Sequence, residues 1–163
     1  ASDYQALLQD RELLLQYVRR SLEIKRGFIE ADEFDEGRRL VLNYGHSFGH
    51  AIEAATEFGI PHGIAITIGM DLANFVAVQL NYARKELYER MHPALWYNYQ
   101  DFADFPVEAE AVAGALMRDK KNKGKDLQLV LPDRNGSIGL VRHKIRDDFG
   151  GILERYFDAE RTI

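Results

Sequence analysis

Three of the five histidines in this chain lie within a segment of 17 residues, as His46, His50 and His62. Residues three or four apart on a helix share a face, so His46, His50 and Glu53 would project together. Imidazole and carboxylate are the ligands that zinc accepts where thiolate is absent, and the sequence contains no cysteine. The spacing therefore indicates a site for a divalent cation or for an anionic ligand.

A histidine pair at this spacing is more often part of a packed or solvated helix face than part of a metal site. Neighbouring glycines alter this balance, because Gly45, Gly49 and Gly63 each adjoin one of the three histidines. Each glycine inside a helix costs about 1 kcal/mol of helix stability relative to alanine. We expect a ligand or another backbone to approach closely at these positions.

Helices must position these histidines, according to the hydrophobic pattern around them. Residues 46–57 are followed by Gly59 and Pro61, a stop signal that predicts a helix ending there. The apolar run 64–80 contains β-branched residues that would suit a strand, but its length predicts a buried helix.

The rest of the chain follows the same mainly helical pattern. Apolar periodicity predicts further helices at 11–30, near 40–42, and at 83–92, 107–120 and about 145–157. The aromatic stretch 96–106 is interpreted as a packed connection. Two apolar runs on either side of Asn135-Gly136, at 127–131 and 138–141, predict a hairpin. The fold class predicted is therefore mainly α with one small β-hairpin.

Composition limits the function classes. With 163 residues, 46% hydrophobic and 29% charged, the chain suits one globular domain, or one domain with a small appendage. Its net charge of -5 argues against a nucleic-acid partner. Asp71 and Asn74 interrupt the most apolar run, so we expect no membrane association. The absence of cysteine and of an apolar leader favours a cytoplasmic protein.

The segment from Leu42 to Glu53, taken with His62-Gly63, resembles the signature of the 3-dehydroquinate synthase family and its sugar phosphate cyclase relatives. Further motifs occur in the family's order and at similar spacings: Ser21-Leu22-Glu23-Ile24-Lys25, Asp32-Glu33, Gly37-Arg38-Arg39 and Arg118-Asp119-Lys120-Lys121. The resemblance covers about residues 11 to 142. It implies a lyase of the shikimate pathway that cyclises DAHP, a seven-carbon keto-acid sugar phosphate, to 3-dehydroquinate with loss of phosphate.

The resemblance also implies cofactors and partners. Such enzymes use Zn2+ or Co2+ and NAD, and the full-length forms are mostly homodimers. Residues 1–163 would be the single helical metal- and substrate-binding domain, whereas an N-terminal domain would bind NAD. This chain contains no G-x-G-x-x-G turn and no Glu-Val-Ile-Lys type motif, which carries the family's third metal ligand. We therefore expect no turnover by this chain in isolation.

By this resemblance, His46 and His62 are the metal-binding histidines. His50 would contact the substrate phosphate and assist proton transfer. Spacing alone instead pairs His46 with His50, so the two lines of reasoning differ in their choice of ligands.

Other polar residues match family positions that hold the substrate's carboxylate, hydroxyls and phosphate: Lys25, Arg39, Asn43, and one of Lys120 and Lys121. Lys25 is also expected to take part in catalysis together with His50. Because Lys25 lies on the apolar stripe of its predicted helix, we expect it to face the core. His92 and His143 match no functional position.

Three alternatives remain open at this point, one of them a binding module whose site is degenerate. Ile64 stands where the family usually carries Glu, which raises the possibility of a related cyclase such as a 2-deoxy-scyllo-inosose synthase. His50 argues for a branch that eliminates phosphate, because branches that do not eliminate it tend to have Pro at this place. A more distant alternative is a helical metal-dependent hydrolase that uses His46, His50 and Glu53 with a metal-activated water.

Overall fold

The computed structural model describes residues 6, 9–33, 37–118, 126–144 and 148–161. The chain divides into two compact units, Ala1–Leu42 and Asn43–Ile163, and each is described by itself. In the described part of the chain, no helix is both long and apolar enough to cross a bilayer.

The first unit contains the long helix α2 (Arg11–Ala31), which confirms the helix predicted at 11–30. Asp10 caps it, since its carboxylate accepts the backbone N–H groups of Glu12 and Leu13 at 2.9 and 3.1 Å. No residue of α2 is buried, and Lys25 is exposed. This exposure is that of the first unit by itself, so the expectation that Lys25 faces the core stays a prediction.

A turn held by Asp32 follows α2. The Asp32 carboxylate accepts the backbone N–H groups of Gly37 and Arg39 at 2.8 and 2.9 Å, and the Arg39 guanidinium donates to the Glu33 carbonyl at 3.1 Å. These bonds lead into the 3-10 helix η1 (Arg38–Asn43), which is the short helix expected near 40–42.

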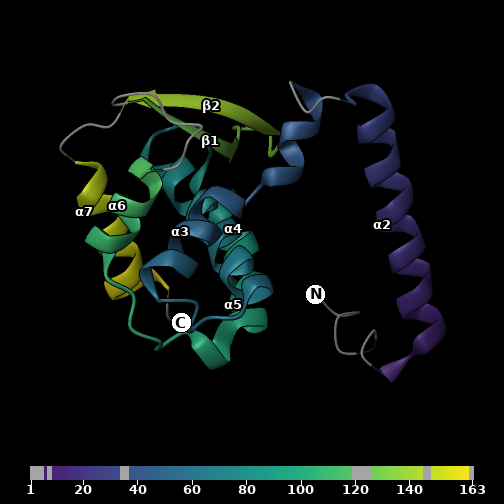
Figure 1. Ribbon diagram of the computed structural model, residues 1–163, viewed down its shortest axis with the longest axis horizontal. Coiled ribbons are helices and arrows are strands. Elements are labelled where there is room, and N and C mark those ends of the chain that lie inside the picture. The colour runs from purple at the N-terminus through teal and green to yellow at the C-terminus, as the bar shows by residue number, and fades with distance from the viewer. Residues whose placement is uncertain (1–5, 7–8, 34–36, 119–125, 145–147, 162–163) are drawn as a thin grey trace. The chain divides into compact units, whose positions relative to one another are not determined.

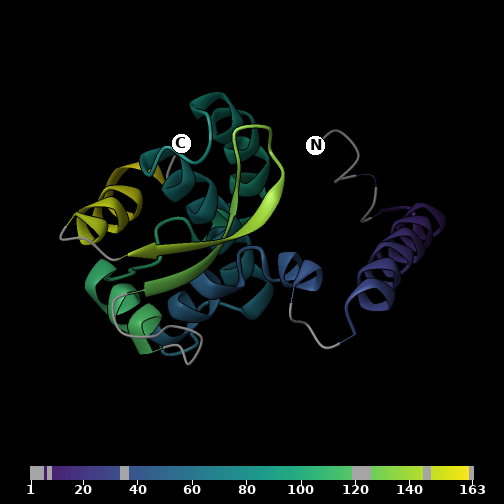
Figure 2. The same ribbon diagram turned by 90° about the horizontal axis from the view of Figure 1, so that it is seen from above.

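The second unit packs helices around α4, with a hairpin across one end of them (Figures 1 and 2). Its elements are α3 (His46–Ala55), α4 (His62–Gln79), α5 (Lys85–Tyr99), η2 (Gln100–Phe102), α6 (Ala109–Arg118), β1 (Asp126–Pro132), β2 (Ile138–Lys144), α7 (Phe149–Arg155) and the π-turn η3 (Tyr156–Glu160). The helix α4 contacts α3, α5, α7 and β1. Most of its residues are buried, as expected for a helix that is apolar on nearly all sides.

The hairpin pairs β1 with β2 in antiparallel register, from Asp126 opposite Lys144 to Pro132 opposite Ile138. Gly136 takes φ +84° in the turn, a conformation that favours glycine. The mainly α architecture with one hairpin, predicted from the sequence, is confirmed.

Three boundaries differ from the prediction. The helix α5 continues to Tyr99, so Trp96 and Tyr97 are helical and do not belong to a connection. The last helix, expected over about 145–157, is observed as α7 followed by the π-turn η3, and residues 145–147 lie outside the described residues. Helix α6 begins at Ala109 and is described as far as Arg118.

The helices α3 and α4 cross with their backbones close together. A Cβ added at Gly45 would lie 2.8 Å from the Ile66 carbonyl oxygen, and one added at Gly49 would lie 2.9 Å from the Ile66 Cα. The close approach expected at these two glycines is confirmed, and its cause is another backbone. At Gly63 a Cβ would meet nothing within 4 Å, so among the described residues no other backbone approaches there, and the approach of a ligand stays a prediction.

A buried carboxylate ties α4 to α5 and to the C-terminal turn. Asp71 on α4 is 0% exposed, and its Oδ2 accepts hydrogen bonds from Tyr99 Oη at 2.6 Å, His92 Nδ1 at 2.7 Å and Tyr156 Oη at 2.9 Å. The three donors compensate in part for removing this carboxylate from water, because its other oxygen, Oδ1, is buried without a hydrogen-bond partner among the described residues. His92, which matches no functional position in the sequence, thus has a structural role.

Buried phenols make the stability of the fold sensitive to alkaline pH. Burial raises the pKa of Tyr44 to about 12, although its hydrogen bond to Asn74 lowers that pKa in part. Burial, followed by the nearby Asp71 charge, also raises the pKa values of Tyr88, Tyr99 and Tyr156. In the unfolded chain a tyrosine has a pKa of about 10.

We expect the free energy of unfolding to fall as the pH rises from about 10 through 12. A group whose pKa is higher in the folded protein than in the unfolded chain stabilises the fold fully at pH values below its unfolded-state pKa. That contribution is lost as the pH rises through the folded-state pKa. Urea unfolding at pH 8, 10 and 11 measures the loss, and Tyr44→Phe should lose less than wild type over that interval. Lysines are the same in both proteins, so identical pH profiles would contradict the role of Tyr44.

Candidate functional site

Three imidazoles lie around one point at the start of α3 and α4. The ring centroids are 5.6 Å apart for His46 and His50, 6.1 Å for His46 and His62, and 5.8 Å for His50 and His62. The two histidines on α3 are thus each about as far from His62 as from one another. The structure brings together both the pair indicated by spacing and the pair implied by the resemblance.

Local structure explains how His62 returns to the α3 histidines. Between the two helices, Ile60 is buried at 1% exposure, which anchors the connection. Pro61 follows as the N-cap of α4, with φ -58°. Proline has no backbone N–H group, which suits the start of a helix, because the first N–H groups there have no partner within the helix. His62 therefore begins α4 on the side where α4 meets α3.

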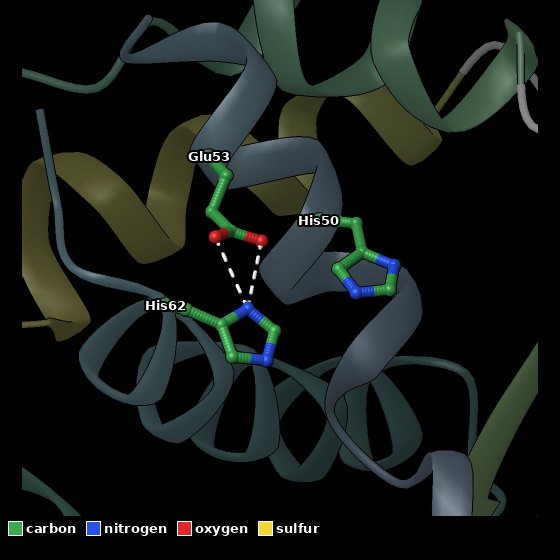
Figure 3. Close-up of side chains that lie close together, drawn as sticks. All are labelled: His50, Glu53 and His62. Carbon is green, nitrogen blue, oxygen red and sulfur yellow. Dashed lines mark hydrogen bonds and ion pairs between the residues drawn. The ribbon is translucent and has the colours of Figure 1, made fainter. Parts of the chain in front are cut away.

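Hydrogen bonds define which nitrogen carries the proton on two of the rings. His46 Nδ1 lies 3.3 Å from the Tyr44 carbonyl oxygen, and His62 Nδ1 lies 3.1 Å from each carboxylate oxygen of Glu53 (Figure 3). Carbonyl and carboxylate oxygens only accept, so in the neutral rings Nδ1 carries the proton. Nε2 is then left with its lone pair, which is the form that binds a metal.

The donor set suits a divalent cation. One ligand atom from each of His50, Glu53 and His62 lies within 4.8 Å of the others. A zinc–imidazole bond is about 2.0–2.1 Å long, so ligand atoms around one ion lie no more than about 4 Å apart. A small movement of the side chains would close the remaining difference.

A pocket of about 340 Å³ adjoins His50 between α3 and α6. Besides His50, its polar lining residues are Ser47 and Arg118. Imidazole, hydroxyl and guanidinium groups together suit an anion. Sequence reasoning did not single out Arg118 or Ser47, although each lies within a motif that carries the family resemblance.

The remaining predicted residues are not all placed near the histidines. Asn43 is half-buried at the end of η1, three residues before His46. Lys25 and Arg39 belong to the first unit and are described only within it. Lys120 and Lys121 lie outside the described residues.

Glu53 has a partner that spacing did not indicate. Its place three residues after His50 suggested a ligand on the same helix face, whereas its carboxylate contacts the ring of His62 on the next helix. This contact exists because the chain reverses between α3 and α4, so that the start of α4 lies against α3. No local pattern in the sequence predicts that the two helices pack in this way.

Comparison with known proteins places this site in a family. The chain matches the family model described as 3-dehydroquinate synthase C-terminal over residues 1–122. It is 34% identical over 138 residues to the 3-dehydroquinate synthase of Dictyoglomus thermophilum, which covers 84% of this chain and 39% of that protein. The synthase of Rhodopirellula baltica is 36% identical over 135 residues, with 82% and 36% covered. The chain thus spans less than half the length of these relatives.

Two solved structures of 2-deoxy-scyllo-inosose synthase share the fold. One gives a TM-score of 0.71 at 21% identity and covers 91% of this chain and 41% of that chain. The other, complexed with carbaglucose-6-phosphate, NAD+ and Co2+, gives 0.60 at 23% identity, with 76% and 36% covered.

Proposed function

Because this chain belongs to the 3-dehydroquinate synthase family, we propose that residues 1–163 are the metal- and substrate-binding part of such a synthase. The proposed reaction is the cyclisation of DAHP to 3-dehydroquinate with release of phosphate. The observation that carries the proposal is the convergence of His46, His50 and His62, with ring centroids 5.6 to 6.1 Å apart, within the matched region. The proposed full-length enzyme is a homodimer.

His46 and His62 are the residues proposed to hold Zn2+ or Co2+. Both rings have Nδ1 engaged in a hydrogen bond, so in the neutral form both carry the lone pair on Nε2. A bound divalent cation would polarise a substrate hydroxyl or the carbonyl formed from it. NAD is proposed to bind mainly to residues outside this chain.

His50 is proposed to bind the substrate phosphate and to move a proton at its departing oxygen. Its exposed ring borders the pocket that also contains Ser47 and Arg118, where an anion would find three donor groups. Motif alone supports the proposal that Lys25, Arg39, Asn43, and one of Lys120 and Lys121 bind the other charged and hydroxyl groups of the substrate.

A 2-deoxy-scyllo-inosose synthase is the second candidate. The two solved structures compared above are of this type, and Ile64 departs from the family pattern. Those structures are at most 23% identical, so they support the fold alone. The curated relatives at 34% and 36% identity are 3-dehydroquinate synthases, which favours DAHP as the substrate. Membership of this family also argues against a metal-dependent hydrolase.

A chimera tests the proposal. The chain replaces the aligned residues of the Dictyoglomus thermophilum synthase, and phosphate release from DAHP is measured with NAD and Zn2+ present. We expect turnover by the chimera and none by the isolated chain. His50→Ala should lower kcat by about 10² to 10⁴, the usual contribution of a positioned proton-transfer group. Glu57→Gln, an exposed change just beyond α3, should leave kcat unaltered.

Other outcomes would point elsewhere. A chimera that binds NAD and Zn2+ but releases phosphate only from a hexose 6-phosphate would favour the second candidate. Release from neither substrate by such a folded chimera would contradict both. Turnover by the isolated chain would show that it needs no further domain.

A further inference from the structure

We infer that Glu53 is a positioning residue, which fixes the tautomer and orientation of His62 so that Nε2 is presented to the cation. The inference rests on the proposed metal-binding role of His62. It assigns to Glu53 a task different from ligation, although its carboxylate lies close enough to the rings to be considered a ligand.

The geometry of the contact is the first support. Both Glu53 oxygens lie 3.1 Å from the same atom, His62 Nδ1, so the carboxylate faces that nitrogen symmetrically (Figure 3). A carboxylate can only accept, and therefore holds the proton on Nδ1. A carboxylate that orients a metal-binding histidine through its other nitrogen is a recurrent arrangement in metal sites.

Burial of the two partners is the second support. The Glu53 side chain is 10% exposed, whereas that of His62 is 60% exposed. Taking a carboxylate out of water costs several kcal/mol unless it is paired. Among the described residues, the ring of His62 is the hydrogen-bond partner of the Glu53 side chain. The buried carboxylate is thus the fixed member of the pair, and it restrains a ring that is mostly exposed.

The three histidines differ in this respect. His46 is restrained in the same way, because its Nδ1 donates to the Tyr44 carbonyl. Within the described part of the chain, no hydrogen bond restrains the ring of His50. A metal ligand benefits from one fixed tautomer, whereas a residue that transfers protons must exchange them. The hydrogen bonds therefore separate His46 and His62 from His50 by role, independently of the motif.

Glu53 itself is less suited to bind the cation directly. Both of its oxygens are already directed at one N–H group, and binding a cation would turn at least one of them away. His62 would then lose the acceptor that holds its proton on Nδ1.

Nitrogen-15 NMR of the metal-free chain at pH 8.5 tests the tautomer directly. We expect His62 to carry its proton on Nδ1 in wild type. In Glu53→Ala it should shift toward the Nε2–H form that histidine favours in water. Glu53→Gln keeps an acceptor oxygen and should retain most of the Nδ1–H form, and Glu57→Gln should match wild type. An Nε2–H ring in wild type, or no change in Glu53→Ala, would overturn the inference.

Cobalt titration of the same proteins, followed by visible absorption, measures the consequence for metal binding. Glu53→Ala should weaken Co2+ binding by about 10- to 100-fold, and Glu53→Gln should weaken it less. A loss in Glu53→Gln as large as that in His62→Ala would identify Glu53 as a ligand and overturn the inference. Circular dichroism establishes that each variant is folded.

The two measurements also separate the inference from the proposed function. Absence of Co2+ binding by the wild-type chain would count against the proposed metal site, whereas the tautomer of His62 in the metal-free chain would still decide the role of Glu53.

Discussion

Gly69→Ala is expected to lower the free energy of unfolding by about 2 kcal/mol or more, although alanine is the better helix former. The added Cβ would overlap the Gly45 carbonyl oxygen and lie 2.6 Å from the Gly49 nitrogen. Both atoms belong to the backbone, so no side-chain rotation can relieve the overlap. The helices α3 and α4 would have to separate, and Co2+ binding by the histidines should weaken with them.

Gly63→Ala is the matched control for this prediction, because it lies on the same helix and its Cβ would meet nothing within 4 Å. Its stability should be unaltered or higher by about 0.5–1 kcal/mol. Urea unfolding followed by circular dichroism measures both variants. Equal stability of Gly69→Ala and Gly63→Ala would contradict the close crossing of the two helices.

Asp71→Ala should destabilise the protein by about 3–5 kcal/mol, because it removes the acceptor of a buried, charge-assisted network. His92 Nδ1 and the hydroxyls of Tyr99 and Tyr156 would be left without the carboxylate that they share. The loss should be seen in urea unfolding at pH 7.

The exposed Asp101→Ala, in the short helix after α5, provides the comparison and should change stability by no more than about 0.5 kcal/mol. A similarly small effect at Asp71 would mean that the three donors find other partners without cost.

Local sequence patterns predicted those helices and strands that are determined by neighbouring residues in the chain. The α3 and α4 helices follow from hydrophobic runs bounded by glycine and proline, and the hairpin follows from Asn135-Gly136. The extension of α5 to Tyr99 could not be predicted in this way. Tyr99 is held by Asp71, 28 residues earlier in the chain, so a tertiary contact continues the helix through an aromatic stretch.

The same distinction between local and long-range causes applies to the candidate site. His46 and His50 share a face of one helix, which spacing alone predicts. Bringing His62 to that face requires the chain to reverse at Pro61, and only the family resemblance indicated that pairing. Whether His46 and His62 bind a metal stays a prediction. The contact of Glu53 with His62 could not be foreseen, because it depends on how two helices cross.

The backbone contact between α3 and α4 also limits how this site could be redesigned. The atoms that meet at this contact belong largely to the peptide groups, which a substitution cannot remove. The separation of the two helices is therefore set by Gly45, Gly49 and Gly69, and repacking larger side chains elsewhere would not bring the helices closer. An engineered change in metal preference would have to come from replacing the histidines themselves, or from changing the groups that accept their Nδ1 protons, such as the Glu53 carboxylate.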